Sequence, residues 1–220
     1  LQYAAPRRGN FVRARPVEKM MPSFVYLASQ SPRRRQLLEQ LGVPYELLLP
    51  DDSEDAEALE VVLKNEAPEA YVKRVTNLKL DAAVARLNRR QLKPAPILCS
   101  DTTVALGRKI YGKPEDASGA KRMLTELSSR THRVLTAVAI QSGRKRSDAL
   151  SISKVTFEAM TQKQINAYVA TGEPLGKAGA YAVQGRAALH ITRIDGSYSG
   201  IMGLPIHETA LLLKSAGLKI

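Results

Sequence analysis

The sequence has 220 residues, of which 44% are hydrophobic and 25% are charged, a composition typical of a globular protein rather than a disordered or fibrous one. The 33 basic and 21 acidic residues give a formal net charge of +12, which predicts a polyanionic partner such as nucleotide phosphates or nucleic acid. Because only 5% of residues are aromatic and none is Trp, a stacking platform for single-stranded nucleic acid is poorly supported. No apolar run approaches the roughly 20 residues that span a bilayer, which argues against a membrane protein.

Two features bear on where the domain begins and where the protein resides. Residues 1–20 carry five basic residues against Glu18, precede the pair Met20-Met21, and lack the continuous apolar segment of a signal peptide. We interpret them as a basic leader, disordered or foreign to the native protein, ahead of a single domain over residues 21–220; a targeting arm is the alternative. The one cysteine, Cys99, is typical of a reducing compartment, which predicts a cytoplasmic protein.

Apolar runs and helical spacings alternate along the chain and predict a mixed α/β sheet with helices packed on it. The predicted strands cover residues 24–29, 45–50, 95–106, 132–142 and 150–160. The predicted helices cover residues 31–42, 69–87, 116–129, 161–172 and 205–217. The acidic segment 51–60 is expected to form a loop or frayed helix, and Asp195-Gly196 to form the turn of a hairpin.

The stretch "LASQSPRRRQLLEQLG" (Leu27–Gly42) predicts a strand, a turn and a helix, with Ser31 at the N-cap and Pro32 in the first helical position. Three arginines follow Pro32, where the helix dipole is already positive. An anion cradle explains them: helix N–H groups, serine hydroxyls and guanidinium groups converge on phosphate oxygens. A solvated basic helix end is the alternative interpretation.

Asp101 interrupts an otherwise apolar strand in "PILCSDTTVAL". Burying an unpaired carboxylate there would be costly, so the residue is either a satisfied structural aspartate or a metal ligand or general base. Glu54 and its acidic neighbours are candidates for a second carboxylate.

Two glycine-containing stretches complete the candidate site. "GRKIYGKP" (Gly107–Pro114) matches G-x-x-x-x-G-K, but Pro114 replaces the hydroxyl residue that holds Mg²⁺ in a P-loop. A β-hairpin therefore explains it better, and leaves Lys113 as one positive side chain near a turn. "EPLGKAGAYAVQG" (Glu173–Gly185) offers the charge of Lys177 and the amide of Gln184, suited to a base edge; a merely flexible loop is the alternative. The three histidines show no metal spacing and no catalytic triad.

Taken in order, these motifs together with "GKPEDASGAKRMLTELSSRTHRVLTAV" and "DGSYSGIMGLP" resemble the Maf family of nucleoside triphosphate pyrophosphatases over Phe24–Leu218. The resemblance implies an elongated α/β fold related to the inosine triphosphatase group, with the site in a cleft between two lobes. It also implies a divalent cation (Mg²⁺, Mn²⁺ or Co²⁺) and a homodimer. "KAGAYAVQG" is similar to the branch acting on dTTP and UTP, since the branch acting on 7-methyl-GTP usually has an acidic residue at the position of Gln184.

The resemblance also implies residue roles. Asp101 would be the catalytic base and a metal ligand, and Glu54 the acidic partner near the metal. The triphosphate would be held by Ser29, Arg33, Arg34, Lys79 and Lys113, with Lys177 offering further charge. Base preference would be set by Arg33, Thr102 and Gln184. The chain departs from the family pattern at Ser129, at Gly176 and in the acidic segment. The departure in the acidic segment leaves Asp51, Asp52 and Glu57 as alternatives to Glu54.

The expected reaction is metal-assisted hydrolysis between the α- and β-phosphates of dTTP and UTP, giving the monophosphate and pyrophosphate. Two alternatives remain open. One is a non-catalytic nucleic-acid-binding or cell-division regulatory module that uses the basic surface. The other is a nucleotidyl- or phosphoryl-transfer enzyme. The embedded carboxylate of Asp101 argues against pure binding, because a site for a polyanion gains nothing from an acid.

Overall fold

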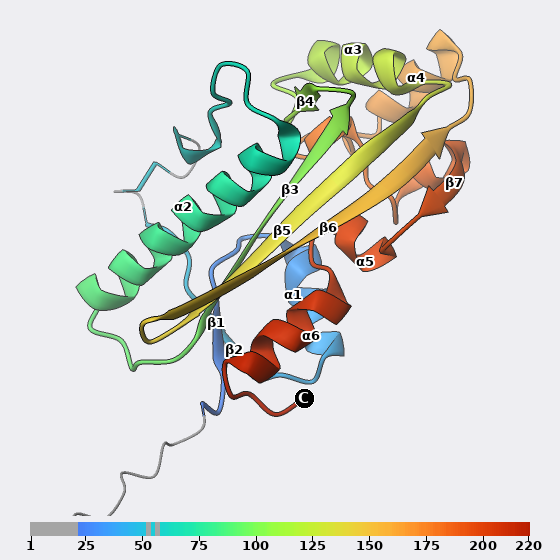
Figure 1. Ribbon diagram of the computed structural model, residues 1–220. Helices are drawn as coiled ribbons and strands as arrows, with labels where there is room; N and C mark the ends of the chain where they lie inside the picture. The colour runs from blue at the N-terminus through green and yellow to red at the C-terminus, as the bar shows by residue number, and fades with distance from the viewer. Residues whose placement is uncertain (1–21, 52–53, 56–57) are drawn as a thin grey trace, which may run out of the picture.

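A mixed sheet of seven strands forms the centre of the protein (Figure 1). In this computed structural model the described residues are 22–51, 54–55 and 58–220; the predicted leader 1–20, together with Asp52 and Glu57, lies outside them. The strands are β1 (Val25–Leu27), β2 (Tyr45–Leu47), β3 (Ile97–Leu106), β4 (Lys109–Tyr111), β5 (Thr131–Ser142), β6 (Lys145–Phe157) and β7 (Ile191–Asp195). Their order is β2-β1-β3-β5-β6-β7, with β4 paired to β3.

The sheet changes character along its width. Strand β1 runs parallel to both β2 and β3, whereas the pairs β3–β5, β5–β6 and β6–β7 are antiparallel. The helices are α1 (Pro32–Gln40), α2 (Pro68–Arg89), α3 (Ala117–Leu127), α4 (Gln162–Val169), α5 (Tyr198–Met202) and α6 (Ile206–Ser215), with short 3-10 turns η1 (Ala58–Glu60), η2 (Ala178–Ala180) and η3 (Arg186–His190). The expected elongated mixed sheet with flanking helices is confirmed.

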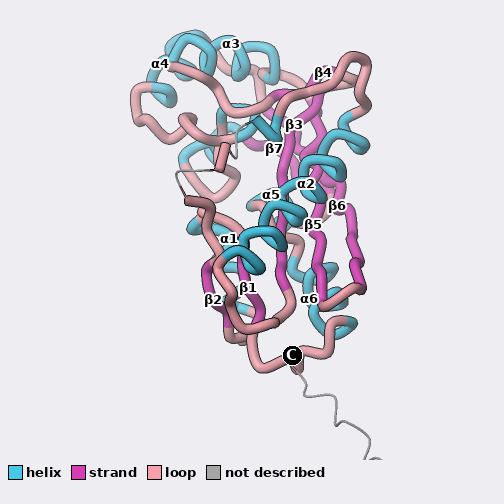
Figure 2. The backbone as a smooth tube through the Cα atoms, turned by 90° about the vertical axis from the view of Figure 1, so that its left-hand side faces the viewer, coloured by secondary structure: helices cyan, strands magenta, loops and turns pink. Residues whose placement is uncertain are grey.

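The helices cover the sheet in two layers and at one end (Figures 1 and 2). Helix α2 lies on one face, where Leu80 and Ala83 pack with Ile97 and Cys99 of β3. Helices α1 and α6 cover the other face through leucines such as Leu38 and Leu213. Helices α3 and α4 close the far end of the long strands over a separate apolar cluster. Strands β3, β5 and β6 therefore run through two lobes, one covered by α1 and α6 and the other closed by α3 and α4. Asp101 lies near the middle of β3.

Local sequence signals account for several element boundaries. Thr161 and Gln164 form a reciprocal capping box at the start of α4, which satisfies two otherwise unpaired backbone donors. The β3–β4 hairpin expected from Gly107–Pro114 is confirmed, with Leu106 opposite Lys109. Among the described residues, no helix combines the length and the apolar character needed to cross a membrane.

The hairpin predicted around Asp195-Gly196 is wrong. Strand β7 ends at Asp195, but the chain then enters α5 instead of a returning strand. The reason is a helix cap: the Ser197 hydroxyl accepts a hydrogen bond from the Gly200 amide, and a serine in this position favours a helix start. Strand β7 pairs with β6 instead.

Candidate functional site

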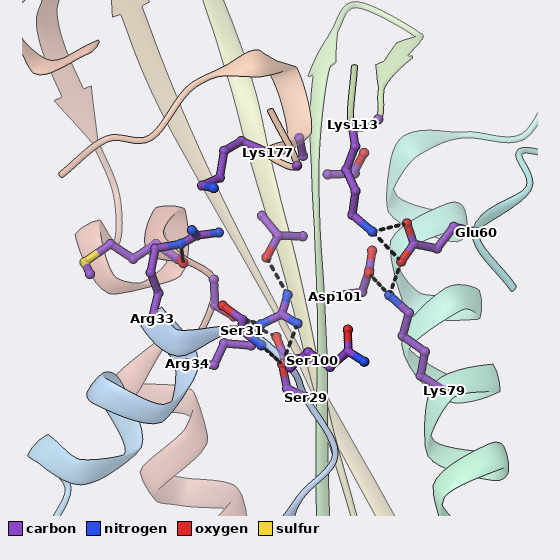
Figure 3. Close-up of a pocket in the computed structure, with 18 of the residues that line it drawn as sticks. Ser29, Ser31, Arg33, Arg34, Glu60, Lys79, Ser100, Asp101, Lys113 and Lys177 are labelled. Atoms are coloured by element: carbon purple, nitrogen blue, oxygen red, sulfur yellow. Dashed lines mark hydrogen bonds and ion pairs between the residues drawn. The ribbon is translucent and has the colours of Figure 1, made fainter. Parts of the chain in front are cut away.

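A cavity of about 620 Å³ lies between the two lobes and is lined by both. The β1–α1 turn contributes one wall, α2 and η1 the opposite one, and the loop before η3 closes the far side (Figure 3). The structure brings together every site residue predicted from the sequence, since all of them line this cavity: Ser29, Arg33, Arg34, Glu54, Lys79, Asp101, Thr102, Lys113, Lys177 and Gln184.

Arg34 is held in place by neutral oxygens. Its Nε donates to the Gly203 carbonyl at 2.7 Å, and its two terminal nitrogens donate to the hydroxyls of Ser29 and Thr102 at 3.3 Å each. Arg33 beside it donates to the Met202 carbonyl at 3.3 Å. Burial lowers the pKa of both guanidinium groups, because leaving water disfavours the charged form. Two desolvated cations therefore face the cavity from the start of α1 (Figure 3).

The hydroxyl of Thr102 is engaged by neighbouring side chains. Thr136 donates its only hydroxyl proton to the Gly200 carbonyl at 2.7 Å, so the 2.9 Å contact between the two threonine hydroxyls requires Thr102 to be the donor. Thr102 thus accepts from Arg34 and donates to Thr136. In this arrangement Thr102 orients the guanidinium of Arg34 and has no proton left for a nucleobase.

Asp101 faces a different set of cations on the opposite wall. Its Oδ1 lies 2.5 Å from Nζ of Lys79, and the same Nζ lies 2.7 Å from Oε1 of Glu60. Glu60 also contacts Nζ of Lys113, at 3.0 Å through Oε2. Burial alone would raise the pKa of Glu60, but the two lysines outweigh it and lower that pKa. Two carboxylates and two ammonium groups therefore form one connected network (Figure 3).

Glu60 is the site residue that sequence reasoning missed. It lies within the acidic segment 51–60, where several carboxylates looked equivalent, and no local pattern distinguished it. Its selection is tertiary: η1 carries it to Lys79 of α2 and to Lys113 just after the β3–β4 hairpin. Such a contact is invisible in a single sequence.

Glu54, the acidic partner expected near the metal, is paired with arginines. Nε and a terminal nitrogen of Arg86 lie 2.8 and 2.6 Å from its two oxygens, and Arg89 lies 2.8 Å from one of them. The hydrogen bonds from Arg86 lower the pKa of Glu54 to about 2. Arg86 is itself buried and donates to the Leu48 carbonyl at 2.7 Å. Both oxygens of Glu54 thus neutralise a buried guanidinium at the edge of the cavity.

Lys177 and Gln184 extend from the loop that closes the far side. The ammonium of Lys177 faces the arginine wall from across the cavity (Figure 3). Burial and, to a lesser extent, the charge of Arg33 lower the pKa of Lys177. Gln184 is solvent-exposed along the cavity rim. Its amide is available to a ligand as both donor and acceptor.

Cys99 and His132 are core residues, as expected for side chains without a catalytic pattern. Cys99 is fully buried, and burial raises its thiol pKa to about 12. His132 is buried against Phe157 and Tyr181, and burial lowers its pKa to about 4. Neither side chain lines the cavity.

Together, these groups define a site for a polyphosphate: Arg33, Arg34 and three lysines share a recess between two lobes of a mixed sheet with the carboxylates of Asp101 and Glu60. The comparison with protein families agrees with this class. The model described as "Maf-like protein" matches residues 24–216, and the chain belongs to this family.

Relatives named "dTTP/UTP pyrophosphatase" match nearly the whole chain. The protein from Polaromonas sp. is 71% identical over 197 residues, which cover 90% of this chain and 98% of the relative. The protein from Albidiferax ferrireducens is 70% identical over 200 residues, or 91% of this chain and all of the relative. The protein from Cupriavidus pinatubonensis is 63% identical over 199 residues.

Proposed function

We propose that this protein is a nucleoside triphosphate pyrophosphatase that hydrolyses dTTP and UTP to the monophosphate and pyrophosphate. The observation that carries the proposal is the position of Asp101, a buried carboxylate in the middle of a cavity whose cations Arg33, Arg34 and Lys177 are free of ion pairs among the described residues. A site that only bound a polyanion would be weakened by that negative charge. A site that activates water beside a phosphate requires such a group. The names of the close relatives support the same activity.

In the proposed reaction, Asp101 accepts a proton from a water molecule as its oxygen attacks the α-phosphorus. The bond between the α-phosphorus and the bridging oxygen to the β-phosphorus breaks, and pyrophosphate leaves with the electron pair of that bond. Lys79 holds Oδ1 of Asp101 at 2.5 Å and so orients the carboxylate. Placing the base and the water in a fixed geometry supplies part of the rate enhancement.

The cations of both walls stabilise the developing negative charge of the leaving group. Arg33, Arg34 and Lys177 make no ion pair with any carboxylate among the described residues. They therefore bind phosphate oxygens without first losing an ionic partner. Charge-assisted hydrogen bonds contribute about 1.5–3 kcal/mol each, so a triphosphate is favoured over a monophosphate.

The residues of the cavity fit a divalent cation. Oxygens of Asp101 and Glu60 lie within 2.5 and 2.7 Å of one ammonium nitrogen, so the two carboxylates are close to each other. Hard oxygen donors suit Mg²⁺ or Mn²⁺. Among the described residues, no three or more His, Cys, Asp or Glu side chains lie together as a ready metal site. Mg²⁺ is usually held by one or two carboxylates, with substrate phosphates and water as its other ligands.

Asp101 and Glu60 would hold that cation, and the cation would supply neutralisation of phosphate charge. Glu60 takes this place rather than the expected Glu54, because Glu60 shares the ammonium of Lys79 with Asp101, whereas Glu54 pairs with Arg86 and Arg89.

Base selection falls to Gln184 and the loop around it. The amide presents one donor and one acceptor, which match the O4 acceptor and the N3–H donor of uracil and thymine. Thr102 contributes by orienting Arg34. The proposal therefore keeps the expected roles of Arg33 and Gln184 in base preference. It assigns Thr102 an indirect role, through the position of Arg34.

The test is product analysis with the purified full chain. UTP, dTTP, CTP and GTP are incubated with Mg²⁺, Mn²⁺ or Co²⁺ in ¹⁸O-labelled water, and products are followed by phosphorus NMR and mass spectrometry. The proposal expects pyrophosphate and a monophosphate that carries the label, with UTP and dTTP preferred. Orthophosphate with a diphosphate product, or transfer to an acceptor, would contradict it. Salt-dependent duplex binding without turnover would favour the regulatory module instead.

The expected homodimer and cytoplasmic location are part of the same proposal. Light scattering coupled to size-exclusion chromatography tests the dimer, and fractionation of cells that express the protein tests the location.

A further inference from the structure

The loop that carries Gln184 is anchored by a residue that does not line the cavity. Glu173 follows α4 at the beginning of this loop, and its carboxylate lies against the loop's far end. We propose that Glu173 is a positioning residue for base selection, which fixes the segment Ala182–Arg186 and thereby the place of the Gln184 amide. This inference rests on the proposed function and deepens it.

The two oxygens of Glu173 bond on either side of Gln184. Oε2 accepts from the Arg186 amide at 3.0 Å. Oε1 accepts from the Tyr168 hydroxyl at 2.7 Å, and that hydroxyl accepts in turn from the Ala182 amide at 3.3 Å. One carboxylate thus holds a residue two positions before Gln184 and a residue two positions after it. The segment between them has little freedom to move relative to α4.

The packing at Gly185 shows how closely the carboxylate approaches the loop. A Cβ atom at Gly185 would lie 2.3 Å from Oε1 of Glu173 and 2.4 Å from its Oε2. No side chain fits there while Glu173 keeps its position. Glycine at 185 therefore serves the close approach of the carboxylate next to Gln184.

Both oxygens of the Glu173 side chain must accept a hydrogen bond. Tyr168 donates a hydroxyl proton and Arg186 donates an amide proton. An ionised carboxylate accepts at both oxygens, whereas a glutamine has one acceptor oxygen and one donor nitrogen. Glu173→Gln keeps the size of the side chain and removes one of the two bonds.

Lys177 in the same loop is fixed independently of Glu173. The Ala180 amide donates to the Lys177 carbonyl at 3.0 Å, and the Gly179 amide donates to the Gly112 carbonyl at 3.0 Å. These bonds tie the first part of the loop to the chain after β4. Glu173 also acts on Lys177 through its charge, the smallest of the three influences on that pKa, so its main effect is expected on the part of the loop that carries Gln184.

The experiment compares Glu173→Gln with Glu126→Gln in steady-state kinetics of the full chain. Glu126 on α3 also accepts from a tyrosine hydroxyl, that of Tyr111 at 2.6 Å, but lies outside the cavity. Inhibition by inorganic tripolyphosphate, which has no base, reports on the phosphate end alone. We expect Glu173→Gln to raise KM for UTP about tenfold and to reduce the preference for UTP over CTP, with kcat within about twofold.

The same variant should change the tripolyphosphate inhibition constant much less than it changes KM for UTP, and Glu126→Gln should change none of these quantities. Tyr168→Phe, which keeps the bond to Arg186, should shift the UTP preference in the same direction by about threefold. An unchanged UTP/CTP preference in both loop variants would overturn the proposal. So would a parallel change in kcat, KM and tripolyphosphate inhibition, because that pattern indicates general loss of structure.

Equilibrium binding separates this inference from the proposed function. Affinities of UTP and CTP analogues with a non-hydrolysable α,β-bridge are measured by calorimetry for the wild type and Glu173→Gln. A wild type without turnover but with a selectivity that Glu173→Gln removes would contradict the hydrolase and support the positioning role. Turnover by the wild type, together with an unchanged binding preference in Glu173→Gln, would support the hydrolase and contradict the positioning role.

Discussion

On the α1 side of the cavity, Arg33 and Arg34 bond to backbone carbonyls and hydroxyls, whereas on the α2 side, Lys79 and Lys113 bond to carboxylates. The first wall therefore carries partly desolvated positive charge that forms no ion pair among the described residues and is balanced only at a distance by charges such as that of Asp101. The second is close to neutral. An incoming polyphosphate gains the full attraction of the arginine wall, but reaches the lysines only by competing with Glu60 or by recruiting a cation.

This difference assigns separate tasks to the two walls. Burying cations without an ion-pair partner costs stability, and a bound anion would recover that cost, so in the proposed function the arginine wall would provide affinity. The paired wall would orient Asp101 and hold the divalent cation, and would thus perform the chemistry. The following variants test this division, beginning with the largest expected effect.

Asp101→Asn tests whether the paired wall performs the chemistry. The variant keeps the size of the side chain but removes the base, so kcat should fall by about 10²–10⁴-fold. Nucleotide affinity, measured by calorimetry with a non-hydrolysable analogue, should be largely retained, because the arginine wall is intact. Turnover close to that of the wild type would remove Asp101 from its role.

Arg34→Lys tests whether the arginine wall provides affinity. Lysine keeps the charge but cannot bond Gly203, Ser29 and Thr102 at once, as the planar guanidinium does. We expect KM for UTP to rise about 10–100-fold, with a smaller change in kcat. Arg35→Lys is the matched control, since Arg35 is the next residue of α1 and does not line the cavity. Equal effects of the two substitutions would contradict the assignment.

Glu60→Gln tests the carboxylate that joins the two lysines. Removing its charge should weaken Mn²⁺ binding about tenfold, measured by electron paramagnetic resonance in the presence of a non-hydrolysable nucleotide. In the absence of metal, nucleotide affinity should rise instead, because Lys79 and Lys113 lose a competing anion. Glu54→Gln, the matched control, should alter Mn²⁺ affinity less. An unchanged Mn²⁺ affinity in Glu60→Gln would show that Glu60 is not a metal ligand.

Glu54→Gln is expected to act on stability. It removes the charge that neutralises the buried guanidinium of Arg86, so the free energy of unfolding at pH 7 should fall by about 1–3 kcal/mol. Because the pKa of Glu54 is lowered to about 2 in the folded protein, its contribution is present above the ordinary glutamate pKa and is lost as pH falls toward 2. Urea unfolding at pH 7 and at pH 3 should show a smaller difference between the variant and the wild type at pH 3. A difference that grows on acidification would contradict this assignment.

The parts of the fold and site that were predictable depend on local signals. Pro32 after Ser31, the apolar run of β3 and the cap at Thr161 each act over a few residues, so their elements could be placed without knowledge of the rest. Asp101 could be selected because a carboxylate inside an apolar strand is costly without a partner. The helix start at Ser197 was missed because Asp195-Gly196 is also a strong turn signal.

The contacts that could not be predicted join distant parts of the chain. The choice between Glu54 and Glu60 depends on which cations meet the acidic segment in space, Arg86 for one and Lys79 for the other. The direction of the Thr102 hydroxyl depends on a proton that Thr136 donates to Gly200. These are tertiary contacts, and neither residue pattern nor charge indicates them in advance.

The bond between Arg34 and the Gly203 carbonyl has a consequence for biosynthesis. The guanidinium of Arg34 is translated 169 residues before its partner, and the Ser100 hydroxyl donates to the same carbonyl at 2.9 Å. A nascent chain therefore cannot assemble this wall of the cavity before residue 203 has left the ribosome.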